Sequence, residues 1–282
     1  MAVDHYENFP VASWLCPPAI RAAVVAIYHF ARTADDLADE GDVSQALRLS
    51  DLQSYRQALV ATLAGHPEEA DSRWRDVFQR LSQAHRRHQL PSQPLLDLLD
   101  AFEQDVANPV YDTRDELVDY CSRSANPIGR LLLHLQGHHE TQLLHWSDRI
   151  CTALQLINFW QDLSVDTRKG RHYIPRRDAF EHGLTWPPFM SAFDEAHARR
   201  LVADLCSWAR QTMMDGADLP LAVGGRMGWE LRFVVQGGLR VLEKIKRMDH
   251  ETYRQRPTLG SRDLAPLLWR ALCMRRRPYQ SS

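Results

Sequence analysis

Apolar residues recur along most of this chain at the three- and four-residue spacing of an amphipathic helix. Runs of alternating β-branched residues and Asn-Gly hairpin signals, which mark strands, do not occur in the sequence. The connections are short, except for a polar stretch from Val165 to Pro188, which we expect to be a functional loop. The pattern predicts an all-α protein, with one domain over residues 1–282. Its expected helices are 18–40, 44–64, 69–88, 92–107, 113–123, 127–138, 145–164, 191–214, 226–248 and 261–274.

Composition and charge argue against a nucleic-acid-binding protein, a membrane-spanning protein and a secreted protein. The chain has 282 residues and a net charge of −2, so no overall basic character favours nucleic acid as a partner. No stretch approaches the roughly 18 uncharged apolar residues of a membrane span. The N-terminus lacks the basic and apolar regions of a signal peptide, and the five cysteines contain no C-x-x-C. These features predict a cytoplasmic protein with reduced thiols.

A first acidic cluster is expected at the end of the helix over 18–40. Val24, Tyr28, Asp35 and Asp39 fall along one side of this helix, with Arg32 beside them, so the carboxylates are expected to continue its core face. Two carboxylates four residues apart repel each other unless a cation lies between them, and oxygen ligands favour Mg²⁺. The alternative is a charged helix end in water, stabilised by Arg32.

A second acidic cluster follows the same logic on the helix over 145–164. Asn158, Asp162 and Asp166 recur in steps of four and continue an apolar side of that helix. A basic and aromatic segment comes directly afterwards, with Arg168, Lys169, Arg171, His172 and Tyr173. Carboxylates that hold cations, next to Arg, Lys and Tyr that bind phosphate oxygens, suit a metal–diphosphate site. The alternative is an exposed acidic turn followed by a solvated basic loop.

Taken together, the two clusters predict one site. If the two helices face each other, they hold several Mg²⁺ ions around one diphosphate, which makes diphosphate a better leaving group. The rest of the pocket is then expected to be apolar and aromatic, because a carbocation reacts with any loose nucleophile. The predicted metal ligands are Asp35, Asp39, Asn158, Asp162 and Asp166. The predicted diphosphate-binding residues are Arg32, Lys169, Arg171 and Tyr173.

These motifs resemble those of the squalene/phytoene synthase family. The first reads Tyr28-x-Phe30-x-Arg32-x-x-Asp35-Asp36-x-x-Asp39, and the second reads Asn158-x-x-x-Asp162-x-x-x-Asp166 followed by Arg171-x-Tyr173-x-Pro175. A third segment, Tyr120-Cys121 with Gly129 downstream, is similar to another family motif. The resemblance covers about residues 8–175. It implies the isoprenoid-synthase helical bundle with a central active-site cavity, Mg²⁺-dependent ionisation of a prenyl diphosphate, and a catalytic role for Asp36 in the first motif. Tyr28 and Tyr120 are candidate catalytic residues that face the cation or the diphosphate. Alternatively, they are core aromatic residues whose polar tips need only one partner.

Three segments depart from the condensing members of this family and are similar to its hydroxysqualene synthase branch, which belongs to hopanoid biosynthesis. They are Glu7 to Ser13, Ala125-Asn126-Pro127, and Gln161 in place of a frequent arginine. That branch expels diphosphate from presqualene diphosphate and adds water. Asn126 is therefore a candidate for holding the attacking water, with Gln161 as a second amide. Alternatively, Asn126 is a helix N-cap followed by Pro127 in the first turn.

Two other functions stay open at this point. Within the family, the alternative is a synthase that condenses two prenyl diphosphates to squalene or phytoene. From another class, the alternative is a non-catalytic prenyl-lipid-binding or scaffold protein. Arg275 to Arg277 suggest peripheral contact with an anionic membrane, such as the inner membrane surface, although a solvated terminus is the simpler interpretation. The resemblance also suggests that the lipid product is handed over to other squalene-pathway enzymes.

Overall fold

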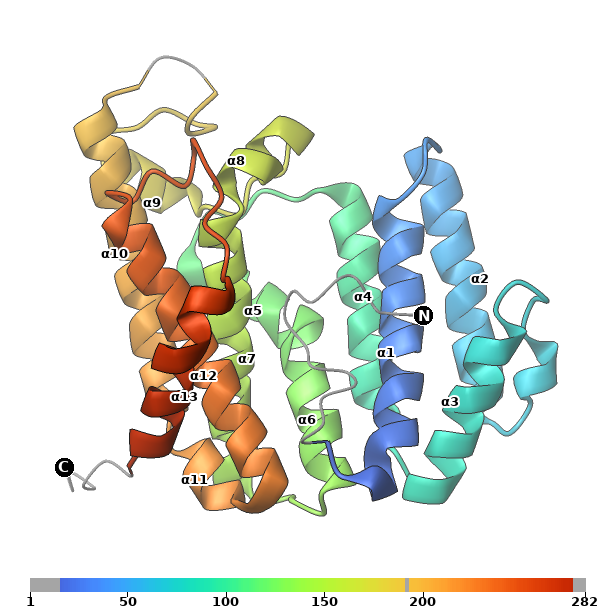
Figure 1. The fold of residues 1–282 in the computed structure, drawn as a ribbon. Helices are drawn as coiled ribbons and strands as arrows, with labels where there is room; N and C mark the ends of the chain where they lie inside the picture. Colours follow the sequence, from blue (N-terminus) through green and yellow to red (C-terminus); the bar gives the residue numbers. More distant parts are fainter. Residues whose placement is uncertain (1–15, 191–192, 276–282) are drawn as a thin grey trace. The chain divides into compact units, whose positions relative to one another are not determined.

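The computed structural model describes residues 16–190 and 193–275. Within these ranges the regular structure is helical and no strand is found, which confirms the predicted all-α class (Figure 1). No helix in the described ranges has the length and apolar character needed to cross a membrane. Short 3-10 turns lie at η1 (Pro67–Glu69), η2 (Thr167–Lys169) and η3 (Ser261–Asp263). The α-helices are α1 (Pro18–Asp39), α2 (Gln45–Leu63), α3 (Arg75–His88), α4 (Gln93–Ala107), α5 (Arg114–Ser124), α6 (Asn126–Leu135), α7 (Thr141–Gln161), α8 (Leu163–Asp166), α9 (Arg176–Glu181), α10 (Glu195–Asp215), α11 (Leu219–Val223), α12 (Gly225–Arg247) and α13 (Leu264–Cys273).

Contacts within the chain divide it into two compact units whose sequence segments interleave. The first unit contains the residues up to Asn108 together with Arg123–His139, and therefore α1 to α4 and α6. The second contains Pro109–Ser122 together with the residues from Glu140 onward, and therefore most of α5 and α7 to α13. The prediction of a single domain over residues 1–282 is not tested by this division and stays a prediction.

The first unit is built around an aromatic cluster that fixes α1 against α2 and α3. Phe30 and Tyr55 stack with their ring centroids 5.5 Å apart, and Phe78 lies 4.7 Å from Tyr55. All three side chains are fully buried. The Tyr55 hydroxyl donates to the Phe30 carbonyl at 3.1 Å, so its polar end has a partner inside the core. This packing orients the helix that carries the first acidic motif.

The second unit is organised by the long helices α7, α10 and α12, which lie alongside one another (Figure 1). Trp160 on α7 is fully buried, and its ring lies 6.2 Å from that of Trp208 on α10. At the end of α10, a Cβ on Gly216 would lie only 2.5 Å from the Trp146 carbonyl oxygen. Glycine is therefore required where α10 meets the first part of α7. These contacts hold the helix that carries the second acidic motif.

The structure corrects the predicted helices in four places. Helix α3 begins at Arg75 rather than at residue 69, because the Asp71 side chain accepts the Arg73 N–H at 2.8 Å and forms a turn there. The polar stretch over 165–188 contains the short helix α9, and α11 lies in a segment where no helix was expected. Finally, α7 ends at Gln161, so the second acidic motif is not carried by one continuous helix.

Candidate active site

The first acidic motif occupies the last two turns of α1. The positions that α1 buries run through Phe30, Ala34 and Ala38, whereas Asp35 and Asp39 each lie one residue further around the helix and are half-buried. The expectation that these carboxylates continue the core face is therefore wrong. A shift of one residue rotates a side chain by about 100° around a helix, which moves it from the core stripe to the boundary of the solvent.

Arg32 provides the counter-charge for this motif. Its guanidinium lies 2.8 Å from Asp35, 2.8 Å from Asp36 and 2.7 Å from Glu40, all within one helix end. Partial burial raises the pKa of Asp36, an effect that Arg32 opposes and that the charges of Glu40 and Asp35 increase. These local ion pairs are what the charged-helix-end interpretation requires. They do not test metal binding, so the roles of Asp35, Asp36, Asp39 and Arg32 stay predictions.

Tyr28 lies two helical turns before Asp35, the first carboxylate of this motif. Its ring is half-buried and meets the ring of His29 edge to face at a centroid distance of 5.6 Å. The predicted catalytic role of Tyr28 is not tested by this contact.

The second acidic motif lies where α7 gives way to α8, and the backbone holds its members in series. The Asp162 N–H donates to the Asn158 carbonyl at 2.9 Å, and the Asp166 N–H donates to the Asp162 carbonyl at 2.9 Å. The Arg171 N–H then donates to the Asp166 carbonyl, also at 2.9 Å. Although the helix is interrupted at Asp162, the backbone spacing from Asn158 to Arg171 is therefore fixed. The structure thus brings together the carboxylates and the basic segment that the sequence placed in succession.

Residues that follow α12 stabilise the break between α7 and α8. The Arg256 guanidinium pairs with both carboxylate oxygens of Asp162, and the Gln161 side-chain nitrogen donates to the Pro257 carbonyl at 2.7 Å. The Ser164 N–H donates to the Thr252 carbonyl at 3.0 Å. Sequence reasoning missed Arg256 because it lies 94 positions from Asp162 and in no motif. Sequence reasoning also proposed that Gln161 holds a water molecule. In the structure the side-chain nitrogen of Gln161 is engaged with the Pro257 carbonyl and anchors this segment.

The second motif places a half-buried carboxylate, Asp166, beside that of Asp162. Burial and the neighbouring Asp162 charge raise the pKa of Asp166 to about 7, against the opposing charges of Arg171, Lys169 and Arg256. Lys169 is exposed at the end of η2, whereas Arg171 is half-buried. A small pocket lies here, lined by Leu163, Asp166, Thr167, Arg171, His172, Tyr173, Ile174, Pro188 and Phe189.

An aromatic cluster adjoins the second motif. The rings of Phe159 and Tyr173 stack with centroids 3.9 Å apart and planes at 11°, and the ring of Tyr120 lies 6.2 Å from each. Tyr111 lies 5.6 Å from Tyr120. Of these four residues the sequence identified Tyr120 and Tyr173. Phe159 is adjacent to Asn158 and so could have been found, but Tyr111 had no local signal.

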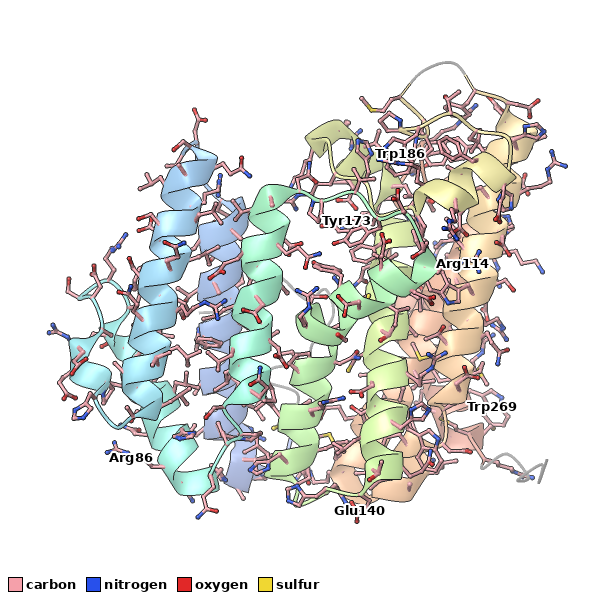
Figure 2. The ribbon with its side chains drawn as sticks, turned by 180° about the vertical axis from the view of Figure 1, so that it is seen from behind. Arg86, Arg114, Glu140, Tyr173, Trp186 and Trp269 are labelled. Carbon is pink, nitrogen blue, oxygen red and sulfur yellow. The ribbon has the colours of Figure 1, made fainter. Side chains whose placement is uncertain are left out.

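The segment that carries Tyr111 and Tyr120 is fixed by ion pairs. Arg114 bridges Asp178 and Asp204, each at 2.5 Å, and stacks on Trp208 with its Cζ 4.8 Å from the ring centroid. Figure 2 shows Arg114 and Tyr173 at the same end of the second unit. The aromatic cluster therefore has fixed geometry and presents π surfaces that favour a cation.

Asn126 belongs to the first unit. It is the first residue of α6 and is 6% exposed, and Ala125 occupies the N-cap position. The N-cap alternative is therefore wrong by one residue, while the water-holding role stays a prediction. The segment from Glu7 to Ser13 lies outside the described residues.

The donor set suits magnesium in its chemistry. The second unit supplies two carboxylates, from Asp162 and Asp166, and the amide of Asn158, all of which offer oxygen ligands. Burial, and then the neighbouring Asp162 charge, raises the pKa of Asp166, and a bound cation would oppose both effects. Among the described residues, no group of three or more His, Cys, Asp or Glu side chains is arranged as a metal site. The magnesium set, which draws on both units, stays a prediction.

Comparison with known proteins identifies the family. A profile of squalene/phytoene synthases matches residues 2–263. The chain belongs to this family. Hydroxysqualene synthase of Sinorhizobium fredii is 33% identical over 250 residues, which are 88% of this chain and 80% of that protein. The crystal structure of squalene synthase HpnC from Alicyclobacillus acidocaldarius superposes with a TM-score of 0.76 at 33% identity, covering 87% of this chain and 90% of that one.

Two proteins of one Zymomonas mobilis strain separate the branches of this family. Its hydroxysqualene synthase is 41% identical over 172 residues, which are 60% of this chain and 54% of that protein. Its presqualene diphosphate synthase is 30% identical over 179 residues, which are 63% of this chain and 59% of that protein. These comparisons confirm the predicted family, its helical fold and the resemblance to the hydroxysqualene synthase branch. The chain is an enzyme of the squalene/phytoene synthase family.

Proposed function

We propose that this enzyme is a hydroxysqualene synthase, which expels diphosphate from presqualene diphosphate and adds water to the resulting carbocation. The observation that carries the proposal is the contrast within Zymomonas mobilis. Identity is 41% to the hydroxysqualene synthase and 30% to the presqualene diphosphate synthase, over spans of similar length. A chain that condensed two prenyl diphosphates would be expected to resemble the second protein more.

Magnesium is the cofactor in this proposal, held by Asp35 and Asp39 of the first motif and by Asn158, Asp162 and Asp166 of the second. When bound, it supplies positive charge that stabilises the departing diphosphate. Arg171 and Tyr173 at the second motif and Arg32 at the first bind diphosphate oxygens, with Lys169 adding charge from the exposed end of η2. Bound diphosphate competes with the Asp carboxylates for Arg32.

The aromatic cluster stabilises the carbocation in this proposal. Tyr120, Phe159 and Tyr173 offer π surfaces beside the second motif. Such surfaces stabilise a cation without forming a bond to it. Water must then reach the cation in one orientation only.

Asn126 holds that water in our proposal. A neutral amide orients water without acting as a strong base, so it favours addition over removal of a proton. Gln161 is less suited, because its nitrogen already donates to the Pro257 carbonyl. The alcohol produced is a hopanoid precursor, made in the cytoplasm and handed to later enzymes of the squalene pathway.

The test is to incubate the purified protein with Mg²⁺ and either presqualene diphosphate or farnesyl diphosphate, without nicotinamide cofactor. We expect an alcohol from presqualene diphosphate and little or no product from farnesyl diphosphate. In ¹⁸O-labelled water the hydroxyl should carry the label. Efficient conversion of farnesyl diphosphate to a hydrocarbon, or an unlabelled alcohol, would contradict the proposal and favour a condensing synthase. Failure of both substrates to react would favour the non-catalytic lipid-binding alternative.

Asn126→Ala tests the water-holding role separately. We expect the products to shift from alcohol toward eliminated or rearranged hydrocarbons, more than diphosphate release slows. The ratio of products, measured by gas chromatography beside diphosphate release, reports the two effects independently. An unchanged ratio would remove Asn126 from the reaction and leave the rest of the proposal in place.

A further inference from the structure

Helix α13 carries an apolar face that points to solvent. Leu264, Leu268 and Leu272 recur at four-residue steps and are 66%, 51% and 53% exposed, and Trp269 beside them is 68% exposed. Exposed residues of this size normally occur singly on a protein surface. Four on one stripe of a ten-residue helix form a continuous apolar strip, which we call the α13 strip.

The opposite face of α13 is firmly attached to the second unit. Leu267 and Ala271 are buried, and the Arg232 guanidinium of α12 donates to the Ala271 carbonyl at 3.2 Å. Arg270 pairs with Glu243 at 2.6 Å. The α13 strip is therefore held outward on a fixed helix and does not result from a frayed end.

The sequence segment that contains the strip carries mostly positive charges, although Glu243 of α12 pairs with its Arg270. From Leu259 to Ser282 the sequence contains five arginines and one acidic residue, whereas the whole chain has a net charge of −2. That acidic residue, Asp263, is buried and paired with Arg240 at 2.8 Å and with Lys244 at 2.5 Å. Arg262 and Arg275 are exposed at the two ends of the helix. The surface here is thus apolar in the middle and basic at its edges.

We propose that the α13 strip docks the enzyme on the surface of an anionic lipid bilayer. Leucines enter the boundary of the acyl chains, Trp269 lies at the level of the headgroups, and the flanking arginines contact lipid phosphates. A helix of ten residues is about 15 Å long, half the thickness of the hydrocarbon core, so it lies in the interface plane. Charge complementarity favours an anionic lipid surface as the partner.

This surface is separate from the candidate active site. Figure 2 shows Trp269 near one end of the second unit and Tyr173 and Trp186 near the other. Variants of the α13 strip can therefore be made without altering the acidic motif or the aromatic cluster. The proposal depends on no step of the proposed reaction, so the two can fail independently.

The experiment measures sedimentation of the full chain with vesicles of phosphatidylcholine, with and without 30% phosphatidylglycerol. We expect binding to the anionic vesicles that weakens with salt. Leu268→Glu should reduce the partition coefficient about tenfold or more, because it removes an inserted leucine and adds a negative charge. The matched control is Leu47→Glu on α2, which replaces a leucine of similar exposure, 48% against 51%, and should bind like the wild type.

A second measurement does not depend on the glutamate variant being folded. Lipids brominated in their acyl chains should quench the tryptophan fluorescence of the wild type, and Trp269→Phe should lose most of that quenching while still binding. Absence of wild-type binding to anionic vesicles, or equal quenching in Trp269→Phe, would overturn the proposal. A wild-type dimer that Leu268→Glu converts to a monomer, without vesicle binding, would also overturn it and assign the strip to a second copy of this chain.

Discussion

The two acidic motifs have the same spacing but differ in what stabilises them. The first lies on an uninterrupted helix, is half-buried, and takes its counter-charge from Arg32, three residues from Asp35. The second lies where a helix breaks, and its counter-charges come both from the nearby Arg171 and Lys169 and from the distant Arg256. The first motif is therefore stabilised within one helix end, whereas the second is also anchored by residues that follow α12.

This difference has consequences for how each motif tolerates change. A local ion pair on a helix surface contributes little to stability, so the first motif can change charge with little effect on folding. The second buries Asp166 beside Asp162, which makes its charge costly without a partner. Substitutions that are equivalent by sequence should therefore differ in their effects on stability, even where they are equally harmful to activity.

The largest effect is expected when a predicted metal ligand loses its charge. Asp162→Asn and Asp35→Asn should each lower kcat with presqualene diphosphate about 100-fold or more, because each removes an anionic ligand. Asp42→Asn, an exposed residue after α1, is the matched control and should be active. Only Asp162→Asn should also lower the Tm clearly, because it removes the partner of Arg256. Activity near that of the wild type at saturating Mg²⁺ would exclude the two-motif site.

The next effect concerns diphosphate. Arg171→Ala and Arg32→Ala should each weaken binding of inorganic diphosphate by about 1.5–3 kcal/mol, the value of a charged hydrogen bond. Isothermal titration calorimetry with Mg²⁺ present measures the change, and Arg87→Ala on the exposed side of α3 serves as the control. Unchanged affinity in either variant would return that arginine to a purely structural role.

The third prediction concerns the ion pairs that hold the segment after α12 against that helix. Burial alone would raise the pKa of Asp263, but hydrogen bonds from Lys244, the Gly260 N–H and Arg240 hold it well below its usual range. Asp263→Asn should therefore lower the free energy of unfolding by about 2 kcal/mol at pH 6. Denaturant unfolding of both proteins measures this difference.

The same comparison has a defined pH dependence. Because the folded pKa of Asp263 is lowered, its stabilisation is complete above about pH 4 and declines as the pH falls toward the folded pKa. The difference in stability between the wild type and Asp263→Asn should thus be smaller at pH 3 than at pH 6. A difference that is constant over this range would show that the carboxylate charge is not what stabilises the segment.

The smallest effect separates the two amides. Gln161→Leu should cost about 1 kcal/mol of stability, because it removes the hydrogen bond to the Pro257 carbonyl, and should leave the ratio of alcohol to hydrocarbon unchanged. Thermal unfolding and product analysis measure the two outcomes. A shift in products without loss of stability would mean that Gln161 acts on the reaction and does not anchor the loop.

The sequence predicted the helical class, most helix boundaries and the members of both acidic motifs, because these depend on local periodicity and spacing. It placed Asp35 and Asp39 on the core face, which was wrong because the buried stripe follows Phe30, Ala34 and Ala38. The sequence alone does not show which side of a helix is buried when small residues such as Ala34 and Ala38 occupy the core positions.

The residues that sequence reasoning missed are those that act over long separations. Arg256 meets Asp162, and Tyr111 meets Tyr173, only because separate segments fold together. Neither Arg256 nor Tyr111 lies next to a sequence motif that would identify it as part of the site. The end of α7 at Gln161 was missed for the same reason, since the contact between Ser164 and Thr252 that accompanies it lies outside any local pattern.

The interleaved segments have a consequence for synthesis on the ribosome. Residues 109–122 emerge between the two parts of the first unit, yet they pack with the second unit. Arg114 is synthesised before its partners Asp178 and Asp204, the second of which lies 90 residues later in the sequence. The side chains of Leu117 and Tyr120 are buried in the folded protein. During that interval the nascent chain has this charge-rich segment in place before the residues that pair with it and bury it. The segment is therefore expected to reach its native packing only after α10 has emerged.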